Sequence, residues 1–516
     1  MDNNAVAVIL QMLLCIIIII LNKKIFISGF GGLLKKAPDK FSLIALGSAA
    51  CFVYSILEKS FLTTAVIITL FAIVNIITER LFAGFEDKKD PTPFSDKMKK
   101  KSEIFVYIVI AISFVTFIIW MILGADIKIA LGYAATVLLS AGSFTLFISA
   151  PLSYDIAHSI AAKFNIIVND TEVFDKADDS EKCIINKTGI ITVGKPVVTD
   201  VFSSDSLTSS GYSALKVDRS EDELIRIAGI MEAQSSHPVA VAVTEYAHNR
   251  AEFEKSDVSG FIKFEGKGLE GKINDAVVRC GSHEFISNHV IIPAEIEERA
   301  GIFSTLGKTP IYYARDNKLL GIIAVQDAVN EDSAQSITEL KDMGLKVLLL
   351  TRDNPKTAKA IADKVGAYEV VYGSFSGEEK EISDKYLNEE NTILIGNDIN
   401  EEANVIINGS VFDISAFIRL SKMTIKNIYR NIFWILLYNI IMIPVACGCF
   451  AKAFGFELSP VVGALLMCIA SLIITCSILG LNRIDIYDPS RDKTLNRRRK
   501  WRKRSRSNIL TISLKS

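Results

Sequence analysis

The sequence predicts a polytopic α-helical membrane protein that carries a cytoplasmic α/β domain, into which a smaller α+β domain is inserted. Half of the 516 residues are apolar, which is too large a share for one soluble domain of this length. The apolar stretches lie near both ends of the chain and flank a polar segment, about 153–426. In this segment aliphatic strands alternate with helical patterns, as in a parallel sheet flanked by helices.

Seven apolar stretches are long enough to cross a bilayer as helices. No basic residue precedes the first stretch and no small-residue cleavage site follows it, so we expect a retained membrane helix and not a cleaved signal peptide. The seven stretches are residues 6–21, 41–57, 62–77, 104–123, 129–151, 428–450 and 458–481.

Three basic clusters predict the orientation in the membrane. They lie around Lys35, Lys36 and Lys40, at 97–101 and at 497–506. All three fall on the cytoplasmic side if the N-terminus lies outside and the C-terminus inside, as the positive-inside rule requires. We therefore expect an integral cell membrane protein whose polar segment lies in the cytoplasm, where nucleotide is available.

Cysteine spacing and charge argue against several kinds of site. The eight cysteines are scattered and none forms a Cys-x-x-Cys pair, which disfavours a disulfide framework and a zinc site of the usual spacing. The net charge is −1, and the dense basic run at 497–504 is typical of a cytoplasmic tail held on anionic lipid. No nucleic-acid-binding fold accompanies this run, so the lipid bilayer and not nucleic acid is the expected partner.

Polar turns follow three of the expected strands. The strands at 180–191, 345–350 and 392–395 run into the turns Asn186-Lys187-Thr188-Gly189, Thr351-Arg352-Asp353 and Gly396-Asn397-Asp398. A further aliphatic strand of the same sheet is expected at 321–325. Because ligands bind beyond the carboxyl ends of the strands in an open parallel sheet, we expect all three turns to face one site.

The segment from Ile184 to Thr192 resembles the phosphorylation signature of the P-type ATPases, in which an aspartate stands directly before Lys-Thr-Gly. The order of the three turns resembles the haloacid-dehalogenase-like phosphorylation domain of that family, and the resemblance covers nearly the whole chain. It implies a phosphorylation-type domain at 153–200 and 310–426 with a nucleotide-binding domain inserted at 201–309. Five membrane helices in 1–152, two in 427–483 and a basic tail at 484–516 complete the expected organisation.

Two motifs in the inserted domain resemble those of the heavy-metal, mainly copper, branch of the family. Ser236-His237-Pro238, preceded by Glu232, looks like a Ser-Glu-His-Pro element, and the run 266–271 looks like the glycine loop of the nucleotide domain. A lone Gly-x-Gly-x-x-Gly is weak evidence, but its order and spacing here strengthen it. The resemblance implies bound ATP and an adenine pocket lined by Glu232, His237, Gly266 and Gly268. An incidental surface histidine is the alternative for His237.

Polar residues in the last two membrane helices extend the resemblance. Tyr438 and Asn439 look like the Tyr-Asn element of the family, and Met467 with Ser471 looks like its Met-x-x-Ser-Ser pattern. The resemblance implies that these four side chains help to hold a soft monovalent metal. Polar groups in a membrane helix often mark function, but Tyr, Asn and Ser also join helices without one. The sequence does not identify the transported metal.

Several positions depart from the family pattern. Asn186 replaces the aspartate that attacks the γ-phosphate, and Gly142-Ser143-Phe144 replaces the Cys-Pro-Cys metal motif, so the thiolates that select Cu(I) are missing. Cys447 and Cys449 could substitute, although small apolar packing is the simpler interpretation. The tripeptide Thr-Gly-Glu does not occur in the chain, and the loop at 79–101 is too short for an actuator domain.

The remaining catalytic turns are also altered. Arg352 stands where the family has glycine between Thr351 and Asp353, and Asn397 replaces a carboxylate that should bind Mg²⁺, which makes Mg²⁺ binding doubtful. Asp398 could substitute after a local shift. The resemblance retains Lys187, Thr188 and Lys380 as phosphate contacts. We hypothesise that Arg352 supplies the positive charge that Mg²⁺ supplies in an active pump.

These losses predict a pseudoenzyme that binds nucleotide without forming a phosphoenzyme and that acts as a regulatory membrane subunit. A metal-transporting ATPase or a second copy of the chain is its expected partner. The alternatives are an ATP-driven heavy-metal translocase of the copper type and a plain membrane scaffold. A haloacid-dehalogenase phosphatase is disfavoured because that chemistry also needs an aspartate at position 186.

Overall fold

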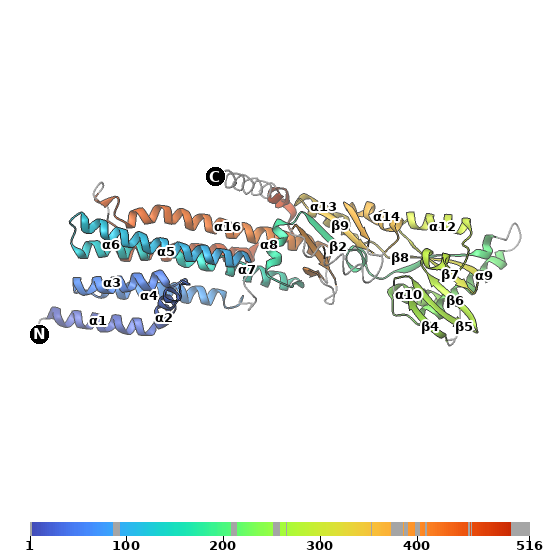
Figure 1. Ribbon diagram of the computed structural model, residues 1–516, viewed down its shortest axis with the longest axis horizontal. Helices are drawn as coiled ribbons and strands as arrows, with labels where there is room; N and C mark the ends of the chain where they lie inside the picture. Colours follow the sequence, from blue (N-terminus) through green and yellow to red (C-terminus); the bar gives the residue numbers. More distant parts are fainter. Residues whose placement is uncertain are drawn as a thin grey trace. The chain divides into compact units, whose positions relative to one another are not determined.

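The computed structural model describes residues 3–85, 93–207, 214–250, 258–264, 266–351, 353–372, 385, 391–397, 403–407, 410–451, 455 and 457–496. The chain divides into two compact units, whose elements are labelled in Figure 1. The membrane unit comprises Met1–Lys163, Asp170–Asp178 and Leu420–Asp485. The sheet unit comprises Phe164–Asn169, Asp179–Arg419 and Ile486–Ser516.

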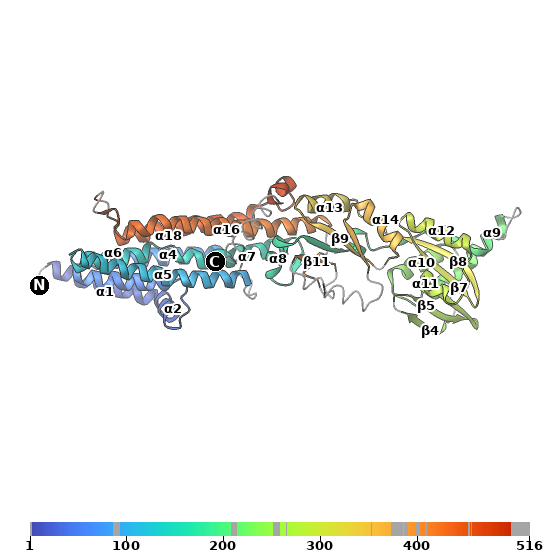
Figure 2. The same cartoon turned by 45° about the horizontal axis from the view of Figure 1, so that its top comes forward.

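The membrane unit is built from helices that follow the predicted apolar stretches closely. Within it, α5, α6 and α16 run alongside one another (Figures 1 and 2), and α3 packs on α6. Its helices are α1 (Asn3–Leu21), α2 (Lys23–Leu34), α3 (Ser42–Glu58), α4 (Leu62–Phe82), α5 (Pro93–Ile122), α6 (Ile127–Ser140), α7 (Ser143–Lys163), most of α8 (Glu172–Asp179), the larger part of α16 (Phe412–Ala446) and α18 (Pro460–Leu479).

Not every predicted stretch meets the length of a membrane span. In the described residues, five helices or continuous helical runs are long and apolar enough to cross a membrane, and α1 with α2, bent by 70°, makes a sixth if the pair is one span. The stretch at 41–57 forms α3, whose 17 residues are shorter. The sequence analysis missed α2, because lysines at its start and glycines near its end interrupt the apolar pattern.

Small residues let the membrane helices approach closely. A Cβ atom added at Gly47 on α3 would lie 2.8 Å from the side chain of Leu139 on α6, so this contact requires glycine. Buried side chains such as Ile67, Leu139 and Met467 form one apolar cluster there. By contrast α1 and α5 leave large apolar side chains exposed, as expected for helices that face lipid.

The first sheet of the sheet unit is mainly parallel. Its strand order is β1-β12-β11-β2-β9-β10, and only the pair β1 and β12 is antiparallel. Ile184, Leu348 and Leu394 form its apolar core, and α13 (Ser333–Asp342) and α14 (Pro355–Val365) pack beside it. The strands are β1 (Ile166–Val168), β2 (Lys182–Asn186), β9 (Lys346–Thr351), β10 (Glu369–Tyr372), β11 (Thr392–Gly396) and β12 (Val405–Ile407).

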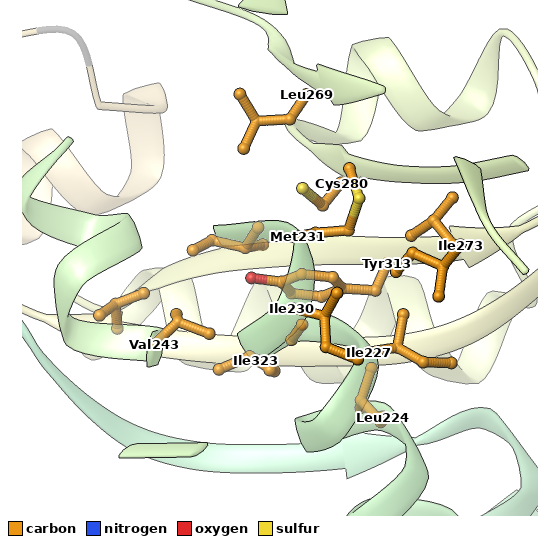
Figure 3. Packing of buried hydrophobic residues seen from close by; sticks show 14 of the residues in the cluster. Leu224, Ile227, Ile230, Met231, Val243, Leu269, Ile273, Cys280, Tyr313 and Ile323 are labelled. Atoms are coloured by element: carbon orange, nitrogen blue, oxygen red, sulfur yellow. The ribbon is translucent and has the colours of Figure 1, made fainter. Parts of the chain in front are cut away.

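The second sheet is antiparallel, with the order β3-β8-β7-β6-β5-β4. One face packs on α9 (Ala214–Glu232) and α10 (Pro238–Arg250), and the other on α11 (His283–Ser287) and α12 (Ala294–Thr305). Figure 3 shows the first of these apolar clusters. The strands are β3 (Val197–Ser203), β4 (Ser259–Phe264), β5 (Gly268–Ile273), β6 (Ala276–Gly281), β7 (Thr309–Arg315) and β8 (Lys318–Gln326).

The assignment of residues 321–325 to the parallel sheet was wrong. They lie in β8, which pairs antiparallel with β3 and β7 in the second sheet. Ile323 of this strand packs on the α9 side, and Ile322 packs on the α11 side. A strand covered on both faces has a continuous apolar sequence whichever way its neighbours run, so the pattern could not distinguish the two sheets.

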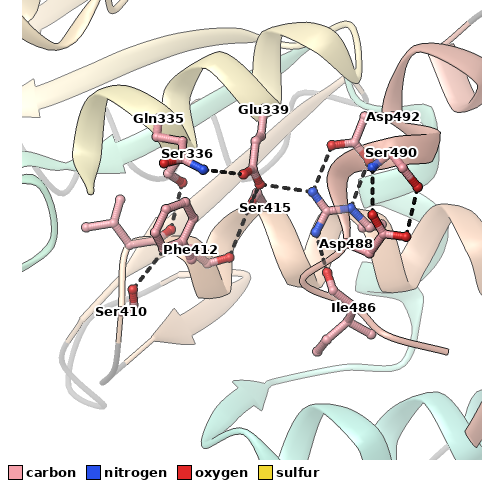
Figure 4. Close-up of polar contacts among 12 residues, drawn as sticks. Gln335, Ser336, Glu339, Ser410, Phe412, Ser415, Ile486, Asp488, Ser490 and Asp492 are labelled. Carbon is pink, nitrogen blue, oxygen red and sulfur yellow. Dashed lines mark hydrogen bonds and ion pairs between the residues drawn. The ribbon is translucent and has the colours of Figure 1, made fainter. Parts of the chain in front are cut away.

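Residues 486–496, part of the segment predicted as a basic tail, belong to the sheet unit and contact it through Arg419. Arg419 of α16 is 1% exposed. It donates to Asp492 from Nε and from Nη2, each at 2.8 Å, to Glu339 at 3.0 Å and to the carbonyl oxygen of Ile486. Figure 4 shows these three partners, Glu339, Ile486 and Asp492, within one network of polar contacts. Residues 497–516, which contain the basic run, lie outside the described part.

Candidate functional site at the carboxyl edge of the parallel sheet

Three strands of the parallel sheet end side by side. β2 lies between β11 and β9, with Ile185 opposite Ile395 and Asn186 opposite Leu350. Since all three strands run in the same direction, the turns that follow them meet at one edge of the sheet. The sequence predicted this convergence, and the strand register confirms it.

The turn after β2 is tight and depends on a glycine. Gly189 has φ = 79°, a left-handed conformation that favours glycine. A Cβ atom at this position would lie 2.1 Å from Nδ2 of Asn397. Asn397, predicted from the sequence as a degenerate Mg²⁺ position, therefore packs directly against the turn that follows Asn186.

Two side chains beyond β8 hold the same turn, and the sequence analysis missed both. Asp327 accepts a hydrogen bond from Thr192 Oγ1 at 2.6 Å and from the backbone N–H of Gly194 at 3.0 Å. Asn330 donates from Nδ2 to the carbonyl oxygen of Ile190 at 2.6 Å. Two polar residues that follow an apolar strand within a few positions were the sequence signal that could have indicated them. These hydrogen bonds hold the backbone of the turn that follows Asn186 and contains Lys187.

Lys187 and Asp353 form an ion pair at the centre of the edge. Nζ of Lys187 lies 2.6 Å from Oδ2 of Asp353, and the two side chains are 9% and 16% exposed. The backbone N–H of Asp353 also donates to Thr351 Oγ1 at 3.1 Å. The pair brings together two predicted site residues that are distant in the sequence, and it leaves the carboxylate of Asp353 engaged with a cation.

The other predicted residues of this edge differ in exposure. Asn186 is half-buried at the end of β2, and Thr188 is exposed. Arg352, Lys380 and Asp398 lie outside the described residues. Among the described residues, no group of three or more His, Cys, Asp or Glu side chains could hold a metal ion. Of the described residues at this edge, Asn397 and an already paired Asp353 make a poor donor set for Mg²⁺, which prefers carboxylates.

The predicted adenine residues lie in the antiparallel domain. Glu232, at the end of α9, is 5% exposed and accepts a hydrogen bond from the Tyr313 hydroxyl at 2.9 Å. It also contacts the Cys280 thiol. Burial raises the pKa of Glu232, and burial next to Glu232 raises the pKa of both Cys280 and Tyr313.

The glycine turn lies against the same strand. Gly266 has φ = 72°, and a Cβ atom at Gly268 would lie 2.2 Å from the carbonyl oxygen of Cys280. Glu232 and Gly268 therefore both lie against Cys280, and a shared adenine pocket stays a prediction. His237 is exposed and accepts at Nδ1 from the N–H of Val239, 3.3 Å away, in the first turn of α10.

Asn439, Met467 and Ser471 are buried, and Asn439 and Ser471 bond to the backbone. Tyr438 is half-buried, and its hydroxyl has no hydrogen-bond partner among the described residues. Asn439 Oδ1 accepts from the N–H of Gly142 at 2.9 Å, and its Nδ2 donates to the carbonyl oxygen of Ile435 at 2.8 Å. Gly142 lies in the break between α6 and α7, next to the ring of Tyr438. Asn439 thus contacts the backbone of Gly142, the first residue of the segment predicted to replace the Cys-Pro-Cys motif, a contact that the sequence did not reveal.

Met467 and Cys447 also have local partners: Ser471 Oγ lies 3.6 Å from the sulfur of Met467, and Thr116 bonds to the sulfur of Cys447. Ser471 donates to the carbonyl oxygen of Met467 at 2.8 Å, within one turn of α18. Cys447 accepts at Sγ from Thr116 Oγ1 at 3.2 Å, and its carbonyl oxygen accepts from Trp120 at 2.9 Å. These contacts fit helix packing at Cys447 better than a substitute metal site.

Comparison with known proteins agrees with this geometry. Residues 183–397 match the family model of haloacid dehalogenase-like hydrolases. The chain is 30% identical over 406 residues to the copper-exporting P-type ATPase B of Archaeoglobus fulgidus, which covers 73% of this chain and 56% of the relative. It is 27% identical over 409 residues to the silver exporting P-type ATPase of Salmonella typhimurium, over 74% and 48% of the two chains. The chain spans about half the length of the curated relatives it matches.

A solved structure shows the same fold. The crystal structure of a zinc-transporting PIB-type ATPase in the E2.Pi state superposes with a TM-score of 0.59 at 17% sequence identity and covers 94% of this chain and 100% of that one. Apolar membrane helices, a haloacid-dehalogenase-like α/β domain and an antiparallel domain are therefore arranged along the sequence as in that fold. The predicted fold class is confirmed.

Proposed function

We propose that this chain, an integral membrane protein with the P-type ATPase fold and a homologue of copper-type heavy-metal P-type ATPases, binds ATP without accepting its γ-phosphoryl group. The observation that carries this proposal is the residue at the end of β2. Asn186 stands where a nucleophilic carboxylate is needed, and a neutral amide is a very poor nucleophile. The backbone around it is nevertheless held in a defined turn.

Charge at the same edge supports anion binding. Lys187 is a cation whose partner, Asp353, comes from the neighbouring strand. The sequence adds a second cation, Arg352, directly before Asp353. We propose that Arg352 replaces the charge of Mg²⁺, since arginine pairs well with phosphate. The role of Lys380 as a further phosphate contact stays part of this proposal.

The connection between α4 and α5 supports a non-pumping role. α4 ends at Phe82 and α5 begins at Pro93, so the chain between them is far too short for a folded domain. We propose that the actuator domain is missing at this place. A chain that binds nucleotide without this domain would act through a partner, either a metal-transporting ATPase or a second copy of itself, with its sheet unit in the cytoplasm.

A heavy-metal translocase is the second candidate, and the names of the relatives favour it. The matched proteins are called copper-exporting and silver exporting ATPases. This candidate requires ATP turnover that depends on a metal and a membrane ligand set. Tyr438, Asn439, Met467 and Ser471 are its proposed ligands, although Asn439 and Ser471 already bond to backbone.

The test is calorimetric titration of the purified full chain in detergent with ATP, with and without a chelator. The proposal predicts binding that survives removal of Mg²⁺ and weakens in His237→Ala. His248→Ala, on the helix α10 that begins directly after His237, serves as the matched control and should bind as the native chain does. Binding that disappears with the chelator would contradict the role given to Arg352. Absence of binding under both conditions would leave the scaffold alternative.

A further inference from the structure

The antiparallel domain contains a polar cluster inside an apolar core. Met231, next to Glu232, and both Cys280 and Tyr313 belong to the cluster of buried side chains between α9, α10 and the sheet. In Figure 3 the Tyr313 ring and the Cys280 side chain lie among Met231, Ile230 and Leu269. Tyr313 is 0% exposed and Cys280 is 1% exposed. The carboxyl group of Glu232 enters this core from the end of α9.

The surroundings of Glu232 favour its uncharged form. In the described part of the chain no lysine, arginine or histidine contributes to its electrostatics, and the titratable groups that face it are Tyr313 from β7 and Cys280 from β6. An ionised carboxylate in such a place costs several kcal/mol, so the group takes up a proton instead. Consistently, burial raises the pKa of Glu232.

The cluster lies directly behind the glycine turn. Gly268 of β5 pairs with Gly281 of β6, next to Cys280. A Cβ atom at Gly281 would lie 2.3 Å from the carbonyl oxygen of Lys267, and the N–H of Ser282 donates to that same oxygen at 2.9 Å. The turn therefore cannot move away from β6 without breaking these contacts. The turn is thereby held against β6, the strand that also carries Cys280, a partner of Glu232.

We propose that Tyr313 and Cys280 are positioning residues, which orient the Glu232 carboxyl group as a combined donor and acceptor for the edge of an adenine base. This inference rests on the proposed nucleotide binding. An uncharged carboxyl group can accept from the amino group of adenine at position 6 and donate to ring nitrogen N1. An ionised carboxylate accepts from the amino group but repels the lone pair of N1. The arrangement thus selects adenine nucleotides while Glu232 stays protonated.

The test is ATP affinity of the full chain as a function of pH, with three variants. The native chain should bind more weakly as pH rises through the pKa of Glu232. Glu232→Gln, whose amide also combines a donor and an acceptor, should bind ATP and lose this pH dependence. Tyr313→Phe removes a hydrogen bond that favours the ionised form, so the loss of affinity should move to higher pH. Tyr312→Phe is the matched control, because Tyr312 packs on the opposite face of the sheet.

Modified nucleotides test the same contact from the ligand side. Loss of N1 in 1-deaza-ATP should weaken binding about tenfold, as expected for one hydrogen bond, whereas 7-deaza-ATP should bind as ATP does. ATP binding that does not vary with pH, with Tyr313→Phe equal to Tyr312→Phe, would overturn this inference and leave the proposed function standing. Absence of ATP binding by the native chain would overturn both.

Discussion

The ammonium group of Lys187 lies 2.6 Å from a carboxylate oxygen of Asp353. This pair joins the turn after β2 to the turn after β9, two neighbouring strands of the parallel sheet. Both side chains are largely buried, so each charge depends on the other. The edge of the sheet is thereby organised around an internal ion pair, beside an asparagine that cannot act as a nucleophile.

Removal of one member of this pair should destabilise the sheet unit. Asp353→Asn leaves the Lys187 ammonium group buried without its counter-charge, a loss of about 3 kcal/mol for a pair with this little exposure. Thermal unfolding of the full chain in detergent measures the effect. Asp363→Asn, at an exposed position of α14, is the control and should unfold like the native chain. Equal melting temperatures for the two variants would mean that the pair contributes no stability.

The turn after β2 should not tolerate a side chain at Gly189. Gly189→Ala forces a β-carbon into a left-handed conformation and against Asn397, with an expected loss of roughly 1–3 kcal/mol. Gly301→Ala, inside α12 with no atom closer than 3.7 Å to the new carbon, should be neutral or stabilise by up to about 1 kcal/mol. A neutral Gly189→Ala would show that the turn relaxes freely.

The segment after the last membrane helix should contribute strongly to stability. Asp492→Ala removes two hydrogen bonds from the buried guanidinium of Arg419, and we expect a loss of about 3 kcal/mol because Glu339 remains as a partner. Asp342→Asn is the control, since its ion pair with Lys493 is exposed and is worth less than about 1 kcal/mol. Equal unfolding of the two variants would contradict a structural role for residues 486–496.

The raised pKa of Glu232 predicts that the stability of the antiparallel domain falls as pH rises. Burial raises its pKa in the folded chain above the ordinary value of 4.5, so the folded state holds a proton that the unfolded state has lost in this interval. The contribution of Glu232 is then fully present below the unfolded pKa and is lost as pH rises through the folded pKa. Glu232→Gln should remove this part of the pH dependence in thermal unfolding. An unchanged pH profile in the variant would refute a raised pKa.

Local patterns in the sequence predicted the elements that carry the candidate site. The strands that end at Asn186, Thr351 and Gly396 were predicted from short aliphatic runs. The first prediction ran on to residue 191, whereas Lys187–Ile191 forms a separate turn. The apolar stretches near both ends of the chain predicted helices that the structure contains. These features depend on a few neighbouring residues, and periodicity reports them directly.

Contacts between distant residues could not be predicted in this way. Lys187 and Asp353 are 166 positions apart, and Asn439 reaches Gly142 across 297. Tertiary packing also decides that β8 lies in the antiparallel sheet and that Tyr313 bonds to Glu232. It likewise decides that residues 486–492 pack over Arg419. A single sequence shows which groups are polar and which are apolar, but not which of them meet.

Phosphoenzyme formation tests the central claim most directly. The purified chain is incubated with γ-labelled ATP and Mg²⁺, with Cu(I) or Zn²⁺ added, then quenched in acid, and the acid-stable phosphate is counted. Asn186→Asp and the double variant Asn186→Asp, Asn397→Asp are measured alongside it. We predict no label on the native chain and label on the double variant, in which the nucleophile and a metal-binding carboxylate are restored. Label on the native chain would contradict the account and favour the translocase, and an unlabelled double variant would contradict an intact nucleotide site.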